Sequence, residues 1–88
     1  MFSLGRTVAT PGALRALEEA CTEPADLLRR HRQGDWGEIH PDDRGLNEAA
    51  LASGGRLMSV YPLSTGKIVW IITEWDRSAT TLLLPEDY

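Results

Sequence analysis

Three segments in the second half of the chain decide the fold: RLMSVYPL (residues 56–63), KIVWIITEW (residues 67–75) and TTLLLP (residues 80–85). All three are rich in β-branched, aromatic and leucine side chains, which is typical of β-strands. The connections STG (residues 64–66) and DRSA (residues 76–79) are short and contain turn-forming residues, which favours antiparallel hairpins. We therefore predict a three-stranded antiparallel β-meander over residues 56–85.

The middle segment of this meander predicts how the sheet is covered. IVWII (residues 68–72) is apolar on both faces of a strand, so we expect cover on both sides, at least in part. Pro62 has no N–H to donate and therefore belongs on an edge strand. Helices should cover one face of the sheet. We expect the other face to be covered by GRTVAT (residues 5–10), by a partner or by a second copy of the chain.

Residues 10–54 have a helical period with three start signals. Each start is marked by a proline suited to the first helical turn, at Pro11, Pro24 and Pro41. Gly34 and the pair Gly54-Gly55 are typical helix ends. The residues expected on apolar helix faces are Leu14, Leu17 and Cys21 in the first helix and Leu46, Ala50 and Leu51 in the third.

Length and charge limit the architecture and the function. Because 88 residues can bury only one core, we predict a single α+β domain over residues 1–88, with two to three helices (10–54) packed on the meander (56–85). So small a core makes self-association into a homodimer, or a partner protein, plausible. A net charge of −4 disfavours direct binding of nucleic acid, which depends on Lys and Arg.

The remaining composition bears on the compartment. Cys21 is the only cysteine, so no intrachain disulfide can form, and we expect it to be a small buried apolar residue. The N-terminal residues lack the apolar stretch of a signal peptide, and the longest apolar run is too short to cross a membrane. A cytoplasmic protein without membrane contact is therefore expected.

The stretch HRQGDWGEIHPDD (residues 31–43) contains two histidines and four carboxylates, which are residue types that bind metal ions. It has none of the usual spacings of zinc or calcium ligands, and we expect neither a metal nor a cofactor. Trp36 lies between Gly34 and Gly37 and is expected to anchor this loop to the core. An exposed recognition tryptophan is the alternative.

The segment ITEWDRSATT (residues 72–81) allows two interpretations. In the structural one, Glu74 pairs with Arg77 and Asp76 accepts hydrogen bonds from the turn backbone. In the functional one, these groups form a ribonuclease site in which Glu74 takes a proton, Arg77 stabilises the phosphorane and His31 protonates the leaving oxygen. Some small ribonuclease toxins have such an order of helices and strands, which is an analogy of fold alone. The candidate catalytic residues of this alternative are His31, Glu74, Arg77 and Thr80.

Across nearly its whole length the chain resembles a family of small uncharacterised proteins of bacterial plasmids, phages and integrative elements, often labelled plasmid-related or hypothetical. The segments that carry the resemblance are ATPGAL (9–14), LLRRHRQGDWG (27–37), DDRGLNEAAL (42–51) and SVYPLSTGKIVWIITEWDRSATTLLLPEDY (59–88), of which GDWG and ITEWDRSATTLLLPEDY are the most specific. The resemblance transfers no catalytic residue. It implies a setting in which small acidic proteins often bind a host protein, including restriction or CRISPR components.

The sequence thus favours a non-enzymatic, acidic binding protein of a mobile genetic element, most concretely an inhibitor or modulator of a host defence complex. The small ribonuclease remains the alternative. The residues expected to contact a partner protein are Asp35, Trp36, Glu38, Asp42, Asp43, Trp75, Asp76 and Tyr88.

Overall fold

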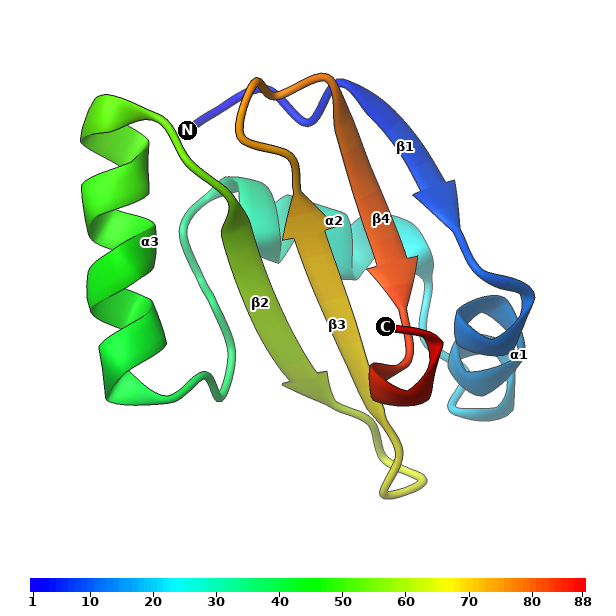
Figure 1. Ribbon diagram of the computed structural model, residues 1–88. Helices are drawn as coiled ribbons and strands as arrows, with labels where there is room; N and C mark the ends of the chain where they lie inside the picture. The colour runs from blue at the N-terminus through cyan, green and yellow to red at the C-terminus, as the bar shows by residue number, and fades with distance from the viewer.

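Four strands form one mixed sheet in the computed structural model, which describes all residues from 1 to 88. Their order across the sheet is β1 (Arg6–Ala9), β4 (Ala79–Leu83), β3 (Ile68–Thr73) and β2 (Leu57–Pro62) (Figure 1). β2, β3 and β4 pair antiparallel, whereas β1 runs parallel to β4. The predicted α+β class and the three antiparallel strands β2, β3 and β4 are confirmed, and Pro62 lies on an edge strand, but the sheet has a fourth strand, β1, and is mixed and not purely antiparallel.

The fourth strand, β1, comes from the segment GRTVAT (residues 5–10). This segment does not cover the second face of the sheet, as one of the three predicted alternatives had it, but extends the sheet beside β4. The N–H of Arg6 donates to the carbonyl of Ser78 at 3.0 Å, and the N–H of Thr10 donates to the carbonyl of Leu82 at 3.0 Å. A parallel neighbour needs a long connection, and three helices between β1 and β2 provide it.

The helices are α1 (Pro11–Glu19), α2 (Pro24–Arg32) and α3 (Pro41–Ser53), and a short 3-10 helix, η1 (Pro85–Asp87), follows β4. Each of the three prolines stands at the predicted helix start. The hydroxyl of Thr10 accepts a hydrogen bond from the N–H of Ala13, as an N-cap does. Gly54, with φ 87°, ends α3 in a conformation that favours glycine. No helix has the length and apolar character needed to cross a membrane.

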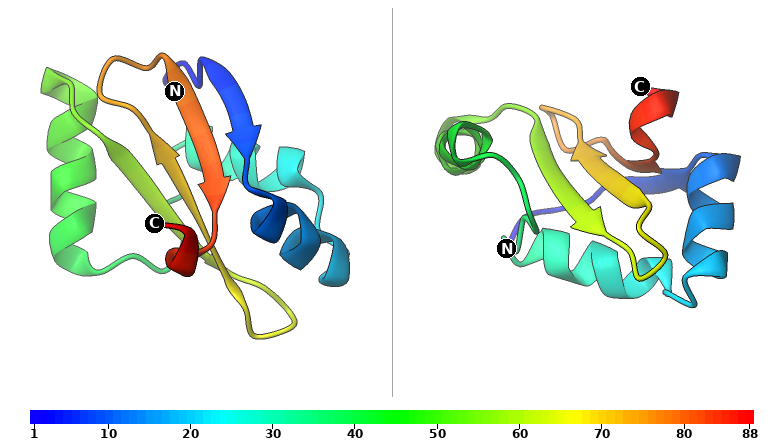
Figure 2. Two further views of the ribbon diagram at one scale, coloured as in Figure 1. Left: turned by 45° about the vertical axis from the view of Figure 1, so that its right-hand side comes forward. Right: turned by 90° about the horizontal axis from the view of Figure 1, so that it is seen from below.

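The elements form two layers with flanking helices. α2 crosses one face of the sheet, α3 lies beside β2, and α1 lies beyond the end of β1, while η1 is on the face opposite α2 (Figures 1 and 2). The main core lies between the helices and the sheet and consists of Ala13, Ala16, Leu17, Leu27, Tyr61, Leu63, Val69, Ile71 and Leu82. A smaller cluster of Trp36, Ile39, Ala50 and Leu57 joins α3 to β2.

The predicted apolar helix faces are only partly correct. Leu17 and Ala50 are buried, whereas Leu14, Leu46 and Leu51 are exposed. Cys21 is also exposed, against expectation, because α1 ends at Glu19 and leaves the cysteine in the following turn with φ 52°.

The rotation of α3 follows from a polar contact. The side-chain amide of Asn47 donates to the carbonyl of Met58 at 2.7 Å and accepts from the N–H of Met58 at 3.1 Å. This pair of hydrogen bonds turns Asn47 and Ala50 toward β2, so that Leu46 on the other side of the helix is 66% exposed.

Candidate functional site

His31 on α2 lies at the centre of a buried polar chain. Its Nδ1 is 2.5 Å from Ser59 Oγ, and its Nε2 is 2.9 Å from Thr73 Oγ1. Thr73 Oγ1 is in turn 2.7 Å from Thr80 Oγ1, whose hydroxyl donates to the carbonyl of Leu4 at 2.7 Å. None of the four side chains in this chain of contacts is exposed to solvent.

The directions of these hydrogen bonds determine the tautomer of the imidazole. Since Thr80 donates its only hydroxyl proton to Leu4, Thr73 donates to Thr80 and must accept from His31. His31 therefore carries its proton on Nε2, and its Nδ1 accepts from Ser59. Burial lowers the pKa of His31 to about 4, which agrees with a neutral ring at pH 7.

Aromatic rings seal the imidazole from solvent. The ring of Phe2 packs against His31 with centroids 5.2 Å apart, and that of Trp36 packs with centroids 5.6 Å apart. A general acid must come within hydrogen-bond reach of the group it protonates, and a phosphodiester cannot reach this ring. Of the four candidate catalytic residues, His31 and Thr80 are thus connected through Thr73, but inside the core.

Arg77 and Glu74 lie at the hairpin between β3 and β4 and do not form the expected ion pair. Two nitrogens of the Arg77 guanidinium donate instead to main-chain carbonyls, those of Ala50 at 3.0 Å, Gly55 at 2.5 Å, Glu74 at 3.1 Å and Trp75 at 3.2 Å. The guanidinium therefore ties the hairpin to the end of α3. The carboxylate of Glu74 is exposed and has no cationic partner within the chain.

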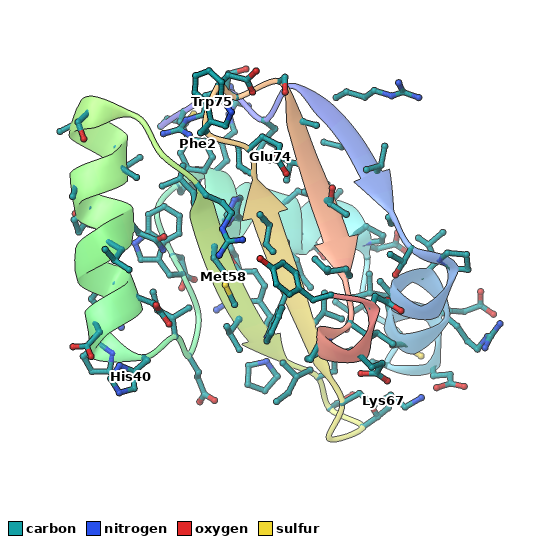
Figure 3. All side chains as sticks on the ribbon, viewed as in Figure 1. Phe2, His40, Met58, Lys67, Glu74 and Trp75 are labelled. Atoms are coloured by element: carbon teal, nitrogen blue, oxygen red, sulfur yellow. The ribbon has the colours of Figure 1, made fainter.

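The expected role of Asp76 in the turn is confirmed. Its carboxylate accepts from the N–H of Ser78 at 3.0 Å, and hydrogen bonds from Ser78 lower the pKa of Asp76. Arg77 has φ 62°, a value that costs a non-glycine residue free energy. The contacts of Asp76 and Arg77 hold this turn in one shape and leave Trp75 at its outside, 69% exposed (Figure 3).

In the segment of residues 31–43, the residues around Trp36 serve mainly to hold the loop in place. Trp36 is buried, as predicted for a loop anchor, and its Nε1 donates to the carboxylate of Glu48 at 3.1 Å. Its expected role as a contact for a partner protein does not fit this position, because its side chain is only 2% exposed. Asp35 accepts from Arg30 at 2.7 Å, which lowers the pKa of Asp35. Glu38, Asp42 and Asp43 are exposed and free of ion pairs with Lys or Arg, and Asp35 is exposed as well although it is paired with Arg30.

The face of the sheet opposite α2 carries the residues that sequence reasoning missed. Cross-strand pairing aligns Met58, Ile72 and Thr81 in one row across the sheet and Val60, Trp70 and Leu83 in another. Ile68 and the half-buried Trp70 of β3 leave apolar surface on this side of the sheet, which we call the uncovered face. Alternation along IVWII could have identified these residues, but the same run was expected to be covered on both sides.

The C-terminal residues pack on the uncovered face. The ring of Tyr88 meets Trp70 with centroids 5.8 Å apart, and its hydroxyl accepts a hydrogen bond from Arg56. A hollow of about 320 Å³ lies beside this contact, and it is lined by Arg56, Ile72, Glu74, Thr81, Leu83 and Tyr88. Tyr88 is thus placed by the fold and still 70% exposed.

The accessible residues of the candidate site are therefore Trp75 and Asp76 at the hairpin, Tyr88 with Trp70 on the uncovered face, and the separate acidic segment of residues 38–43. No group of three or more His, Cys, Asp or Glu side chains is placed to hold a metal ion. Comparison with protein-family models, curated proteins and solved structures finds no match.

Proposed function

We propose that this chain is a small acidic binding protein that acts on another protein, most concretely as an inhibitor or modulator of a host complex such as a restriction or CRISPR defence system. The observation that carries the proposal is the uncovered face. α2 covers one face of the sheet, and the other face carries only the short η1 (Figure 2). On that other face Ile68, Tyr88 and the half-buried Trp70 leave aromatic and aliphatic surface. Exposed apolar side chains on one face of so small a domain favour a role in protein contact.

The hairpin adds a rigid anchor to this surface. Exposed tryptophans are among the side chains that contribute most to binding free energy, and a side chain that is already ordered loses little entropy on binding. The turn that presents Trp75 is held by Arg77 and Asp76. Trp75 is therefore suited to fill an apolar pocket on a partner.

The charges around the hairpin indicate the chemistry of that partner. The carboxylates of Glu74 and Asp76 flank Trp75, neither forms an ion pair within the chain, and the net charge of the chain is −4. We therefore propose a partner surface with an apolar pocket bordered by Lys or Arg side chains. The resemblance to proteins of plasmids and phages suggests the setting, a bacterial cytoplasm in which defence complexes are targets.

A ribonuclease built on His31, Glu74 and Arg77 has less support. The imidazole that should act as general acid is sealed in the core, and the guanidinium that should bind phosphate is occupied by carbonyl groups. RNA cleavage that is lost in Glu74→Gln but retained in the adjacent Asp76→Asn would favour this enzyme over the binding protein.

Affinity capture with matched variants tests the proposal. The wild-type chain, Trp75→Ala and Leu46→Ala serve as baits, since Leu46 is equally exposed but on the outside of α3. A captured protein is identified by mass spectrometry, purified and titrated against each bait. We expect Trp75→Ala to weaken binding at least about tenfold, as hot-spot truncations do, and Leu46→Ala to leave the affinity unchanged. Equal affinity for all three baits would contradict the proposal.

A fourth bait separates the two accessible surfaces, the acidic segment of residues 38–43 and the uncovered face with its hairpin. In this variant Glu38, Asp42 and Asp43 are changed to Lys. Retained binding would assign the partner to the uncovered face and the hairpin, whereas loss of binding in this variant alone would move the site to the acidic segment. Inhibition is measured separately, as the efficiency of phage plating on a restricting host that expresses each variant.

A further inference from the structure

The two edges of the sheet differ in how their backbone groups are satisfied. On the outer edge of β2, the amide of Asn47 pairs with both the N–H and the carbonyl of Met58. Two residues further, the N–H of Val60 donates to the carbonyl of Trp36 at 3.0 Å, and the carbonyl of Val60 accepts from the N–H of Glu38 at 2.8 Å. This edge is therefore closed to another strand.

The outer edge of β1 has no such cover. Arg6 and Thr10 use their N–H groups toward β4, and strand alternation directs those of Val8 the same way. The N–H and carbonyl groups of Thr7 and Ala9 consequently point away from the sheet, and no element lies beyond β1 (Figure 1). A row of free donors and acceptors on an edge strand is a template for another strand.

We propose that β1 pairs antiparallel with β1 of a second copy of this chain, with Val8 on the two-fold axis. In this register Thr7 lies opposite Ala9 of the second copy, and each exchanges both its N–H and its carbonyl. The two Val8 residues form the central pair that is not hydrogen-bonded, in which side chains approach closest. Val8 is 41% exposed in the single chain, so this contact buries apolar surface.

Side-chain charge supports a second copy as the occupant. Arg6, Val8 and Thr10 point to the uncovered face, since Val8 pairs with Thr81. In the proposed register Arg6 lies opposite Thr10 of the second copy, and the hydroxyl of Thr10 donates to Asp87 at 2.7 Å. Arg6 has no ion-pair partner in its own chain. The two-fold symmetry therefore places Arg6 of each copy near Asp87 of the other, so that two such contacts form.

Other pairings lack this complementarity. A parallel, in-register pairing of two β1 strands would place Arg6 beside Arg6, which is unfavourable. In the antiparallel pairing the two sheets become continuous and their uncovered faces adjoin. The proposed dimer does not depend on the proposed partner protein, because its contacts are at the edge of β1 and not on the uncovered face itself.

Cysteine cross-linking tests the register. In a Cys21→Ser background, Val8→Cys places two thiols at the central pair, where the Cα separation suits a disulfide. Thr7→Cys is the matched control, because Thr7 is also exposed and lies on the same strand but opposite Ala9 of the second copy. Under mild oxidation we expect Val8→Cys to form covalent dimers at least about tenfold faster than Thr7→Cys.

Sedimentation of the unmodified chain over a concentration series provides the second measurement. We expect a monomer–dimer equilibrium that Arg6→Glu shifts toward monomer and Arg6→Lys retains, with circular dichroism showing that both variants are folded. A chain that is monomeric at every concentration, or cross-linking that does not distinguish Val8→Cys from Thr7→Cys, would overturn the proposal.

Discussion

His31 on α2 and Thr73 on β3, far apart in the sequence, are joined by a hydrogen bond of 2.9 Å between Nε2 and Oγ1 in the interior of the protein. The imidazole that sequence analysis considered as an acid catalyst is thus a structural group. It connects the helical layer to the sheet through the hydroxyl groups of Ser59, Thr73 and Thr80 on three strands, and the hydroxyl of Thr80 extends this chain of hydrogen bonds to the carbonyl of Leu4.

The stability of the fold should depend on the charge of His31. Because the pKa of this group is about 4 in the folded protein and ordinary values are near 6.5, the unfolded chain binds more protons between these values. The stability that depends on a neutral His31 is fully present above pH 6.5. As the pH falls toward 4, protonation of the unfolded chain lowers the free energy of unfolding by up to about 3 kcal/mol. Urea denaturation at pH 7.5, 6 and 5 measures this dependence.

The two histidines provide the control for that measurement. His31→Gln should remove most of the pH dependence in this window, whereas His40→Gln, at the exposed start of α3, should retain it. A dependence of equal size in both variants would assign the effect to other groups.

Thr73→Val should destabilise the fold by about 1–3 kcal/mol, because the isosteric change leaves the buried Nε2–H of His31 without an acceptor and removes the hydrogen bond that Thr80 Oγ1 accepts. Thr81→Val is the matched change, since Thr81 lies on the neighbouring strand β4 and its hydroxyl makes no hydrogen bond with protein. It should alter the free energy of unfolding by less than about 0.5 kcal/mol. Chemical denaturation compares the two variants. Equal effects would show that the buried chain of hydroxyls adds little.

Arg77→Lys should cost about 1–3 kcal/mol, since a lysine cannot reproduce a fork that donates to carbonyls on α3, on the following loop and within the hairpin. Glu74→Gln should be nearly neutral, and a double-mutant cycle between the two positions should give a coupling energy near zero. A coupling above about 1 kcal/mol would restore the ion pair that the sequence suggested and the structure lacks.

Asn47→Ala should cost about 1–3 kcal/mol, because it removes both hydrogen bonds to Met58 and leaves those backbone groups at the edge of β2 without partners. Leu46→Ala, one position earlier, should change stability by less than about 0.5 kcal/mol, since its side chain faces solvent. Hydrogen exchange of the Met58 amide is the direct readout, and it should quicken only in Asn47→Ala.

Local signals allowed the helices to be predicted. Pro11, Pro24 and Pro41 mark starts that depend only on neighbouring residues, and Gly54 marks an end by its own conformation. The two hairpins that join β2, β3 and β4 could be predicted for the same reason, because short turns join successive strands. Trp36 was correctly expected in the core, since a large ring in a short loop needs apolar contacts.

The remaining features depend on contacts between distant segments. β1 is only four residues long and pairs with a strand from the opposite end of the chain, so no local pattern indicates it. The rotation of α3 follows from Asn47 and not from its leucines, which is why Leu46 and Leu51 were misplaced. Likewise, nothing in the sequence connects His31 to Ser59 and Thr73.

The indole N–H signals of the three tryptophans provide the most direct test of the proposed function. A nitrogen-15-labelled chain is titrated with the purified partner from affinity capture and followed by NMR. We predict that the signal of the exposed Trp75 shifts most, that of Trp70 on the uncovered face shifts less, and that of the buried Trp36 stays in place. Saturable binding that moves Trp36 and leaves Trp75 and Trp70 unchanged would contradict binding through the uncovered face and its hairpin.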